Sequence, residues 1–126
     1  KGCLAGSALM GLGMLVRYFG FQSEASPPTQ YDLGPISDYP LRSRIAVPTA
    51  QAIIIHDSQG YSAISLICPH LGCVVNVTSD GFACPCHGSR YLTNGSLRNG
   101  PASHPLTILR VEVNAEGHLI LYTDQV

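Results

Sequence analysis

Cys68-Pro69-His70-Leu71-Gly72-Cys73 and Cys84-Pro85-Cys86-His87-Gly88-Ser89 are the two stretches that decide how this chain folds and what it binds. Together they hold four of its five cysteines and two of its five histidines. Each stretch offers one Cys and one His close together, and each keeps one further Cys. Two Cys and two His form a complete ligand set for a metal centre, which leaves Cys73 and Cys86 free to form a disulfide.

Length and charge restrict the chain to one small domain and argue against a nucleic-acid partner. The 126 residues can bury one modest core, with little left for a second. Seven basic residues are balanced by eight acidic ones, Lys1 is the only lysine, and no basic run occurs. Proteins that bind nucleic acid need a positively charged surface, so we expect no such partner here.

Residues 1–21 are predicted to form a single transmembrane signal-anchor helix. Residues 2–16 carry no charge, and Arg17 precedes a cluster of aromatic residues. If Arg17 snorkels to the interface and the aromatic rings lie in the interfacial belt, the apolar span reaches the length of about 20 residues that a bilayer requires. The alternative is an export signal cleaved after Ala25. We expect the anchor, followed by a polar hinge or linker with a Pro-Pro pair at residues 22–30.

From residue 31 onward the sequence predicts an all-β domain. Short runs of β-branched residues alternate with turn signals such as Asp57-Ser58-Gln59-Gly60, and no helical period appears. The predicted strands cover residues 44–47, 52–56, 61–67, 73–77, 82–83, 107–113 and 118–122. Because Cys68 follows one strand and Cys84 ends the hairpin that begins at Cys73, we expect the two Cys/His stretches to face each other across one small site.

The four Cys and two His residues of the two stretches are compatible with three kinds of site. A structural zinc site takes four Cys or His ligands, but six candidates are present, and their spacing, Cys-x-His against Cys-x-x-His, is unlike that of common zinc fingers. A framework of disulfides alone leaves both histidines without a role. A [2Fe–2S] cluster with two Cys on one iron and two His on the other accounts for all six residues once the remaining Cys pair is disulfide-bonded. The sequence favours this cluster.

The paired stretches resemble the cluster-binding motifs of Rieske iron–sulfur proteins, in particular the respiratory and photosynthetic branch that oxidises quinol. The motifs C-x-H-x-G-C and C-P-C-H-G-S carry the resemblance, which extends over about residues 31–126. It implies an antiparallel β-sandwich with a small cluster-binding subdomain, whose loops lie at about residues 66–105. One loop departs from the family, because Gly100-Pro101-Ala102-Ser103 stands where respiratory members have Gly-Pro-Ala-Pro. We expect this loop still to cover the site.

The resemblance implies four iron ligands. Cys68 and Cys84 are expected to bind one iron of a single [2Fe–2S] cluster through their thiolates, and His70 and His87 to bind the other iron. Each histidine then keeps an outer nitrogen whose pKa rises when the cluster is reduced, so that uptake of an electron and uptake of a proton are coupled. We therefore expect His70 or His87 to contact the quinol.

The resemblance also implies roles for four neighbouring residues. Cys73 and Cys86 are expected to form a disulfide between the two loops, which requires an oxidising compartment. The hydroxyl groups of Ser89 and Tyr91 are expected to donate hydrogen bonds to a cluster sulfur and to a ligand cysteine. Such donors raise the reduction potential toward the upper part of the Rieske range of about −150 to +300 mV. Leu71 is an apolar residue beside the histidine ligands, so its side chain is expected to cover the cluster and to form part of a docking face.

Anchor, linker and motifs together predict a membrane-anchored, high-potential subunit of a cytochrome bc-type quinol oxidoreductase. We expect it to take an electron and a proton from quinol beside a cytochrome b subunit, and to pass the electron to a c-type cytochrome or a similar acceptor. The head is expected on the periplasmic side of a bacterial cytoplasmic membrane. Two alternatives stay open: the small Rieske subunit of an exported molybdenum oxidase such as arsenite oxidase, and a soluble Rieske ferredoxin. The anchor and the second Cys pair argue against the ferredoxin.

Overall fold

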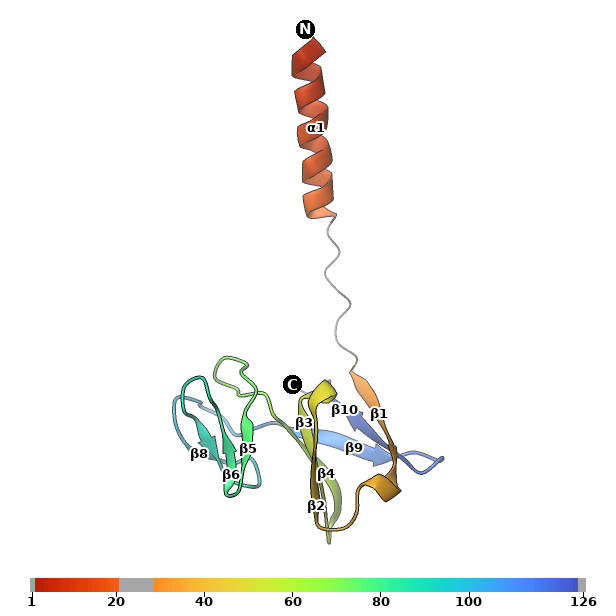
Figure 1. Cartoon of the computed structure of the whole chain (residues 1–126), viewed down its shortest axis with the longest axis vertical. Coiled ribbons are helices and arrows are strands. Elements are labelled where there is room, and N and C mark those ends of the chain that lie inside the picture. The colour runs from red at the N-terminus through yellow and green to blue at the C-terminus, as the bar shows by residue number, and fades with distance from the viewer. Residues whose placement is uncertain (1, 21–28, 125–126) are drawn as a thin grey trace.

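The computed structural model describes residues 2–20 and 29–124 of the chain (Figure 1). A helix, α1 (Gly2–Phe19), forms where the sequence predicts one, and its described side chains are exposed. Within the described ranges, no helix combines the length and the apolar character that are needed to cross a lipid bilayer. The predicted transmembrane span is therefore not confirmed. The predicted linker lies outside the described residues, apart from Thr29 and Gln30.

The larger sheet has six antiparallel strands in the order β1-β10-β9-β4-β3-β2. These strands are β1 (Gln30–Pro35), β2 (Ser43–Val47), β3 (Ala52–Asp57), β4 (Gly60–Ser65), β9 (Ile108–Val113) and β10 (His118–Tyr122), with 3₁₀ turns at Ile36–Asp38 and Pro48–Ala50. The first residues of β9 pair with β4, and the remaining ones pair with β10. The sheet therefore bends along β9, and residues from its two halves pack into one core, as in a β-sandwich.

A second, smaller sheet lies between β4 and β9 in the chain and carries both Cys/His stretches (Figure 1, green to cyan). Its order is β5 (Asn76–Thr78), β6 (Gly81–Ala83), β7 (Arg90–Tyr91) and β8 (Leu97–Asn99). The antiparallel β fold and the small second sheet agree with the prediction. The strand predicted over residues 73–77 is wrong in part, because only its last two residues belong to β5. The carbonyl of Cys73 and the N–H of Val75 instead bond to the segment before it, at Cys68 and Leu66.

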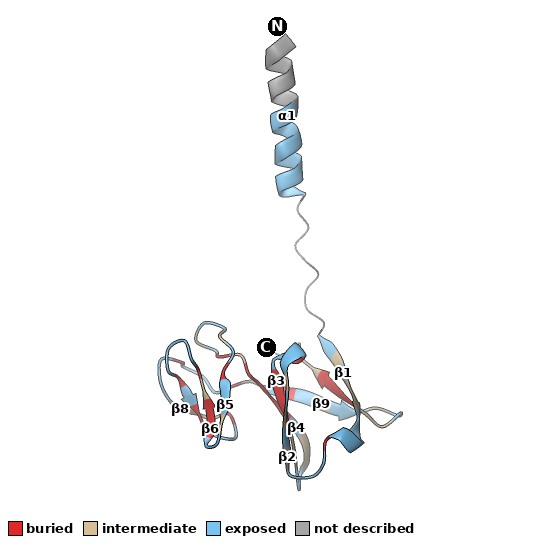
Figure 2. Cartoon of the chain, in the orientation of Figure 1, coloured by how far each residue is buried: buried red, intermediate tan, exposed pale blue. Residues whose placement is uncertain are grey.

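The buried hydrophobic residues form two cores, and Figure 2 shows the buried parts of the chain in red. The first core lies within the larger sheet and consists of Tyr39, Ala50, Ala52, Ile54, Ala63, Leu109, Leu119 and Leu121. The second core joins the small sheet to the larger one and consists of Ile53, Ile64, Leu66, Cys68, Val75, Phe82, Cys84, Tyr91, Ala102 and Leu106. Cys68 and Cys84 are thus fixed by core packing as well as by their loops.

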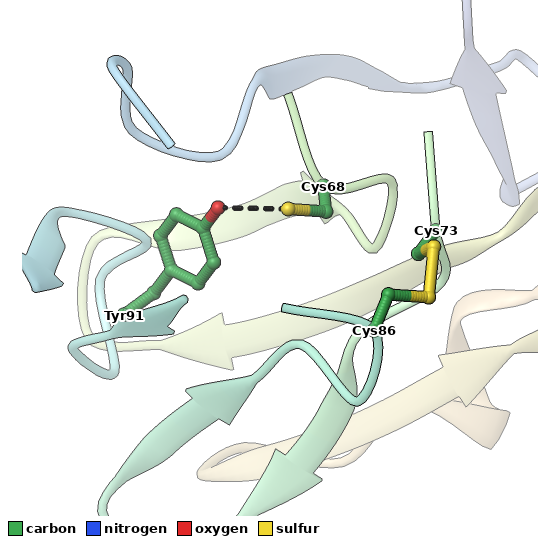
Figure 3. Close-up of a disulfide and its surroundings, with 4 residues drawn as sticks. All are labelled: Cys68, Cys73, Cys86 and Tyr91. Atoms are coloured by element: carbon green, nitrogen blue, oxygen red, sulfur yellow. Dashed lines mark hydrogen bonds between the residues drawn. A yellow bond between two sulfur atoms is a disulfide. The ribbon is translucent and has the colours of Figure 1, made fainter. Parts of the chain in front are cut away.

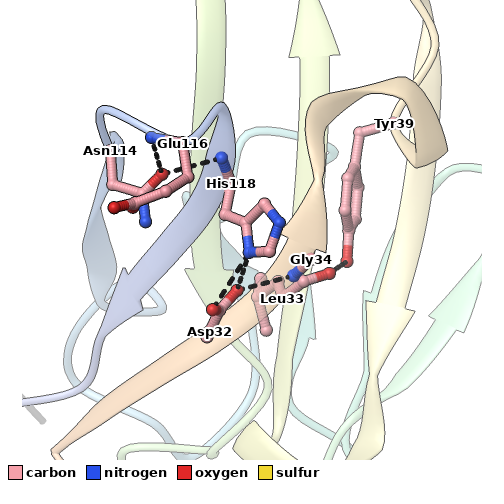
Figure 4. Close-up of polar contacts among 7 residues, drawn as sticks. All are labelled: Asp32, Leu33, Gly34, Tyr39, Asn114, Glu116 and His118. Atoms are coloured by element: carbon pink, nitrogen blue, oxygen red, sulfur yellow. Dashed lines mark hydrogen bonds and ion pairs between the residues drawn. The ribbon is translucent and has the colours of Figure 1, made fainter.

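Polar contacts tie the turn between β9 and β10 to β1 (Figure 4). The Nδ1 atom of His118 lies 3.1 Å from both carboxylate oxygens of Asp32. The backbone N–H of Gly34 donates to the same carboxylate at 2.9 Å, and Asn114 accepts the N–H of His118 at 2.8 Å. The Gly34 N–H, followed by the His118 ring, lowers the pKa of the Asp32 carboxyl below its ordinary value of 3.8.

Candidate metal centre

The first Cys/His stretch forms a closed turn between β4 and β5. The backbone N–H of Cys68 donates to the carbonyl of Cys73 at 2.8 Å, and the N–H of Gly72 donates to the carbonyl of Cys68 at 2.9 Å. Gly72 has a φ of 78°, a left-handed conformation that glycine adopts without strain. The turn holds the Cys68 side chain in the core at 1% exposure, while Leu71 at its tip is 70% exposed.

The second stretch repeats this turn between β6 and β7. The N–H of Cys84 donates to the carbonyl of Ser89 at 2.8 Å, and the N–H of Gly88 donates to the carbonyl of Cys84 at 3.1 Å. Gly88 has a φ of 76°. Cys84 and Ser89 are buried, whereas His87 is exposed. Each loop therefore buries the cysteine at its start and presents the following residues at the surface.

A disulfide between Cys73 and Cys86 joins the two loops, as predicted (Figure 3). Its two Cα atoms lie 6.6 Å apart. The Sγ atom of Cys84 lies beside it, and the three sulfur atoms are all within 4.8 Å of one another. Since Cys73 and Cys86 are bonded to each other, the free thiols among residues 29–124 are Cys68 and Cys84, and both are buried.

Tyr91 on β7 lies against the first of these thiols. Its Oη atom is 3.2 Å from the Sγ of Cys68, and both side chains are buried (Figure 3). Burial, followed by this contact, strongly raises the pKa of the Tyr91 hydroxyl. Burial by itself raises the pKa of the Cys68 thiol as well, but hydrogen bonds, led by the one from Tyr91, hold that pKa below its ordinary value. When Cys68 is a thiolate, as a metal ligand must be, the phenol is the donor and the sulfur accepts.

The two histidines lie next to each other, one from each loop. The centroids of the His70 and His87 rings are 4.9 Å apart, and the ring planes meet at 85°. His70 is half-buried, and its Nδ1 atom is buried without a hydrogen-bond partner. A buried polar atom left unpaired costs about 1–3 kcal/mol. Coordination to a metal would remove this cost, which makes the Nδ1 of His70 a candidate ligand atom.

The loop at residues 100–105 covers the second turn, as expected. The backbone N–H of Ala102 donates to the Oγ atom of Ser89 at 3.1 Å, and Ser89 is completely buried. Because Ser89 accepts this bond, its hydroxyl hydrogen remains available to donate. Gly100 has a φ of 118° and passes so close to Ser89 that a Cβ at Gly100 would overlap the Ser89 backbone. Ser103, which replaces the proline of the family motif, is exposed.

The donors of this site suit an iron–sulfur centre. Two thiols and imidazole nitrogens are ligands for both zinc and iron–sulfur clusters. Among the residues that the structure describes, Cys84 and the two disulfide sulfurs form a group within 4.8 Å, but the disulfide sulfurs are bonded to each other and are not available as ligands. The donors that remain are two thiols and two neighbouring imidazole rings, which is the ligand set of a [2Fe–2S] cluster held by two Cys and two His.

One support of the site was not predicted. Gly81 on β6 has a φ of 147°, and a Cβ there would overlap the carbonyl of Tyr91. Glycine at this position thus lets β6 approach the residue that contacts Cys68. The sequence signal is the turn Ser79-Asp80-Gly81, which by itself explains this glycine only as a turn residue.

Comparison with known proteins identifies relatives of the chain. A family model, the Rieske [2Fe-2S] domain, matches residues 29–112. The cytochrome b6-f complex iron-sulfur subunit of Synechococcus sp. (strain RCC307) is 45% identical over 71 residues, which cover 55% of this chain and 39% of the relative. The subunit of the same name from Gloeobacter violaceus is 40% identical over 81 residues, which cover 60% and 44%. The chain thus spans about 40% of the length of these curated relatives.

Two solved structures have a similar fold. The cyanobacterial plasma membrane Rieske protein PetC3 from Synechocystis PCC 6803 aligns with a TM-score of 0.52 and 24% identity, over 72% of this chain and 97% of that chain. The quaternary ammonium Rieske monooxygenase CntA, in complex with L-carnitine, aligns with a TM-score of 0.54 and 18% identity, over 79% of this chain and 33% of that chain. At these identities the likeness concerns the fold alone.

Proposed function

Because this chain belongs to the Rieske [2Fe–2S] domain family, we propose that it is the electron-transfer subunit of a membrane complex that oxidises quinol, of the cytochrome b6-f or bc type. The observation that carries the proposal is the pair of adjacent imidazole rings, whose centroids are 4.9 Å apart; His70, which supplies one of them, directly precedes the exposed Leu71. The names of the relatives from Synechococcus and Gloeobacter support the same type of complex.

We assign four residues to the cluster. Cys68 and Cys84 supply the two thiolates, because they are the buried free thiols of the described residues. His70 and His87 supply the imidazole nitrogens, and the unpartnered Nδ1 of His70 supports this role. When bound, the [2Fe–2S] cluster supplies a redox centre that takes up and releases one electron.

His87 is the residue that we assign to the quinol. It is exposed, whereas His70 is half-buried, so the outer nitrogen of His87 is the more accessible acceptor for a hydrogen bond from a quinol hydroxyl. The imidazole then holds the proton that the quinol loses on oxidation. The side chain of Leu71, at 70% exposure, forms an apolar contact for the quinone ring or for the subunit that binds it.

The hydroxyl groups of Ser89 and Tyr91 set the potential in this proposal. Both side chains are buried, so their hydrogen bonds act in a medium of low dielectric constant. A donor to a sulfur stabilises the reduced, more negative state and raises the potential. We therefore propose a potential in the upper part of the Rieske range.

Location and partners follow from the same assignment. The Cys73–Cys86 disulfide persists only in an oxidising compartment, so we place the head on the extracytoplasmic side of a membrane. A cytochrome b subunit and a c-type cytochrome or similar acceptor are the proposed partners. Attachment through the N-terminal segment remains a prediction, which extraction of membranes with alkaline carbonate would test.

The decisive experiment measures whether the cluster responds to a quinol analogue. Membranes that contain the intact complex are reduced, and the electron paramagnetic resonance spectrum is recorded with and without a quinol-analogue inhibitor. We expect the spectrum to change, and we expect Leu71→Ala to weaken the response. Leu41→Ala is the matched control, because Leu41 is also exposed, at 59%, but lies in the turn before β2. A spectrum that does not change with the inhibitor would instead indicate that the chain only relays electrons, as the small Rieske subunit of a molybdenum oxidase would.

A further inference from the structure

The thiol of Cys84 lies next to a disulfide with which it can react. Its Sγ is within 4.8 Å of both the Cys73 and the Cys86 sulfur. The three residues lie on the two turns and are held by the backbone hydrogen bonds that close them. A thiol held in place beside a disulfide exchanges with it far more readily than a dissolved thiol does, because no encounter is needed.

We propose that in the metal-free chain Cys84 isomerises the structural disulfide, and that metal binding prevents this reaction. The Sγ of Cys84 attacks the Sγ of Cys73, the Cys73–Cys86 bond breaks, and a Cys73–Cys84 bond forms. The electron pair of the broken bond leaves on the Cys86 sulfur, which receives the proton that Cys84 gives up. One disulfide and one thiol are present before and after, so no oxidant or reductant is required.

Burial favours Cys73 over Cys86 as the sulfur that is attacked. Cys73 packs against the second core, to which Cys84 belongs, whereas Cys86 is exposed. Attack at Cys73 therefore expels Cys86 into solvent, where water stabilises the leaving sulfur. The product Cys73–Cys84 also keeps the two loops joined, while attack at Cys86 would link two cysteines of the same loop.

Cys68, the other buried thiol, is not positioned for this reaction. Its sulfur does not belong to the group of sulfurs around the disulfide, and its own contacts are with the Tyr91 hydroxyl, at 3.2 Å, and with the Cys84 side chain. The inference that metal binding prevents the exchange rests on the proposed role of Cys84 as an iron ligand. A sulfur that is bound to iron cannot attack a disulfide at the same time. Exchange in the metal-free chain removes Cys84 as a ligand, so the exchange competes with binding of the metal.

Peptide mapping tests the proposal. The full chain with Cys3→Ala is prepared metal-free and cluster-loaded, its free thiols are trapped with iodoacetamide without reductant, and its disulfides are identified by mass spectrometry. Fragmentation at Pro85 locates the label on Cys84 or Cys86. We expect the metal-free chain to lose part of its Cys73–Cys86 peptide and to gain Cys73–Cys84 with alkylated Cys86. The loaded chain should keep Cys73–Cys86 alone.

Two matched variants separate exchange from loss of the metal. Cys84→Ser and Cys68→Ser each remove one proposed ligand, so both are metal-free. We expect Cys84→Ser to keep Cys73–Cys86 and Cys68→Ser to exchange as the parent does. A metal-free parent that keeps only Cys73–Cys86 would overturn the proposal, and so would disulfides that join Cys68 to Cys73 or Cys86, because Cys68 does not belong to the group of sulfurs around the disulfide. Alkylated Cys84 in the cluster-loaded chain would overturn the assignment of Cys84 as an iron ligand, but it would not contradict the exchange in the metal-free chain.

Discussion

Removal of the Tyr91 hydroxyl tests the electrostatic reasoning about this site most directly. Tyr91→Phe keeps a ring that is 98% buried in the second core and deletes only the oxygen that lies 3.2 Å from the Cys68 sulfur. The packing of β7 against β6 is unaffected, because the pairing of Phe82 with residue 91 uses backbone atoms. The predicted result is a lower reduction potential of the cluster with the cluster still bound.

The size of the shift follows from the hydrogen bond. A hydrogen bond to a charged acceptor contributes about 1.5–3 kcal/mol, and one between neutral groups contributes about 0.5–1.5 kcal/mol. The reduced centre carries more negative charge, so it loses about 1–1.5 kcal/mol more than the oxidised centre when the donor is removed. For a one-electron couple, a tenfold change in the equilibrium constant corresponds to 59 mV, so this difference lowers the potential by about 40–65 mV.

Protein-film voltammetry measures this potential, and a second tyrosine supplies the control. Tyr39 is also buried, and its hydroxyl donates to the carbonyl of Leu33 at 3.1 Å, but it belongs to the first core. We expect Tyr39→Phe to lower the free energy of unfolding without a change in potential. If Tyr91→Phe and Tyr39→Phe have the same reduction potential, the assignment of the Tyr91 hydroxyl as a hydrogen-bond donor to the cluster ligand Cys68 is refuted.

Three further substitutions test other parts of the molecule. Ser89→Ala leaves a buried backbone N–H without its acceptor, so we expect a loss of about 1–3 kcal/mol in chemical unfolding, together with a lower potential. Gly100→Ala places a Cβ against the Ser89 backbone at a φ of 118°, and calorimetry should show a larger fall in Tm than for Gly117→Ala, where φ is 78° and nothing lies within 4 Å. Asp32→Asn removes a carboxylate whose pKa a backbone N–H and a neighbouring imidazole hold below 3.8. The stabilisation that this carboxylate provides is complete above pH 3.8 and is lost as the pH falls through the pKa of the folded state. In urea unfolding, the free energy of unfolding of Asp32→Asn should therefore be lower than that of the parent at neutral pH, and this difference should disappear in acid.

The sequence predicted those parts of the fold in which a local pattern is long enough to be recognised. The hairpin of β3 and β4 has β-branched residues on both sides of a four-residue turn signal, and it forms with the expected pairing. The strands β7 and β8 contain two and three residues, too few for any periodicity. At residues 73–77 the valines are typical of a strand, but backbone groups of that segment close the first loop instead. Tertiary hydrogen bonds thus overrode the local preference.

The site shows a similar division between what spacing specifies and what it leaves open. The two motifs place four sulfurs on two loops, but four cysteines allow several pairings, and the family resemblance was needed to choose Cys73 with Cys86. The structure explains why spacing was insufficient, because Cys84 lies within 4.8 Å of the same two sulfurs. Proximity alone therefore leaves Cys73 two partners, Cys84 and Cys86. Under the proposed ligation, iron bound to Cys84 removes one of them, so the native disulfide is specified jointly by the fold and by the metal.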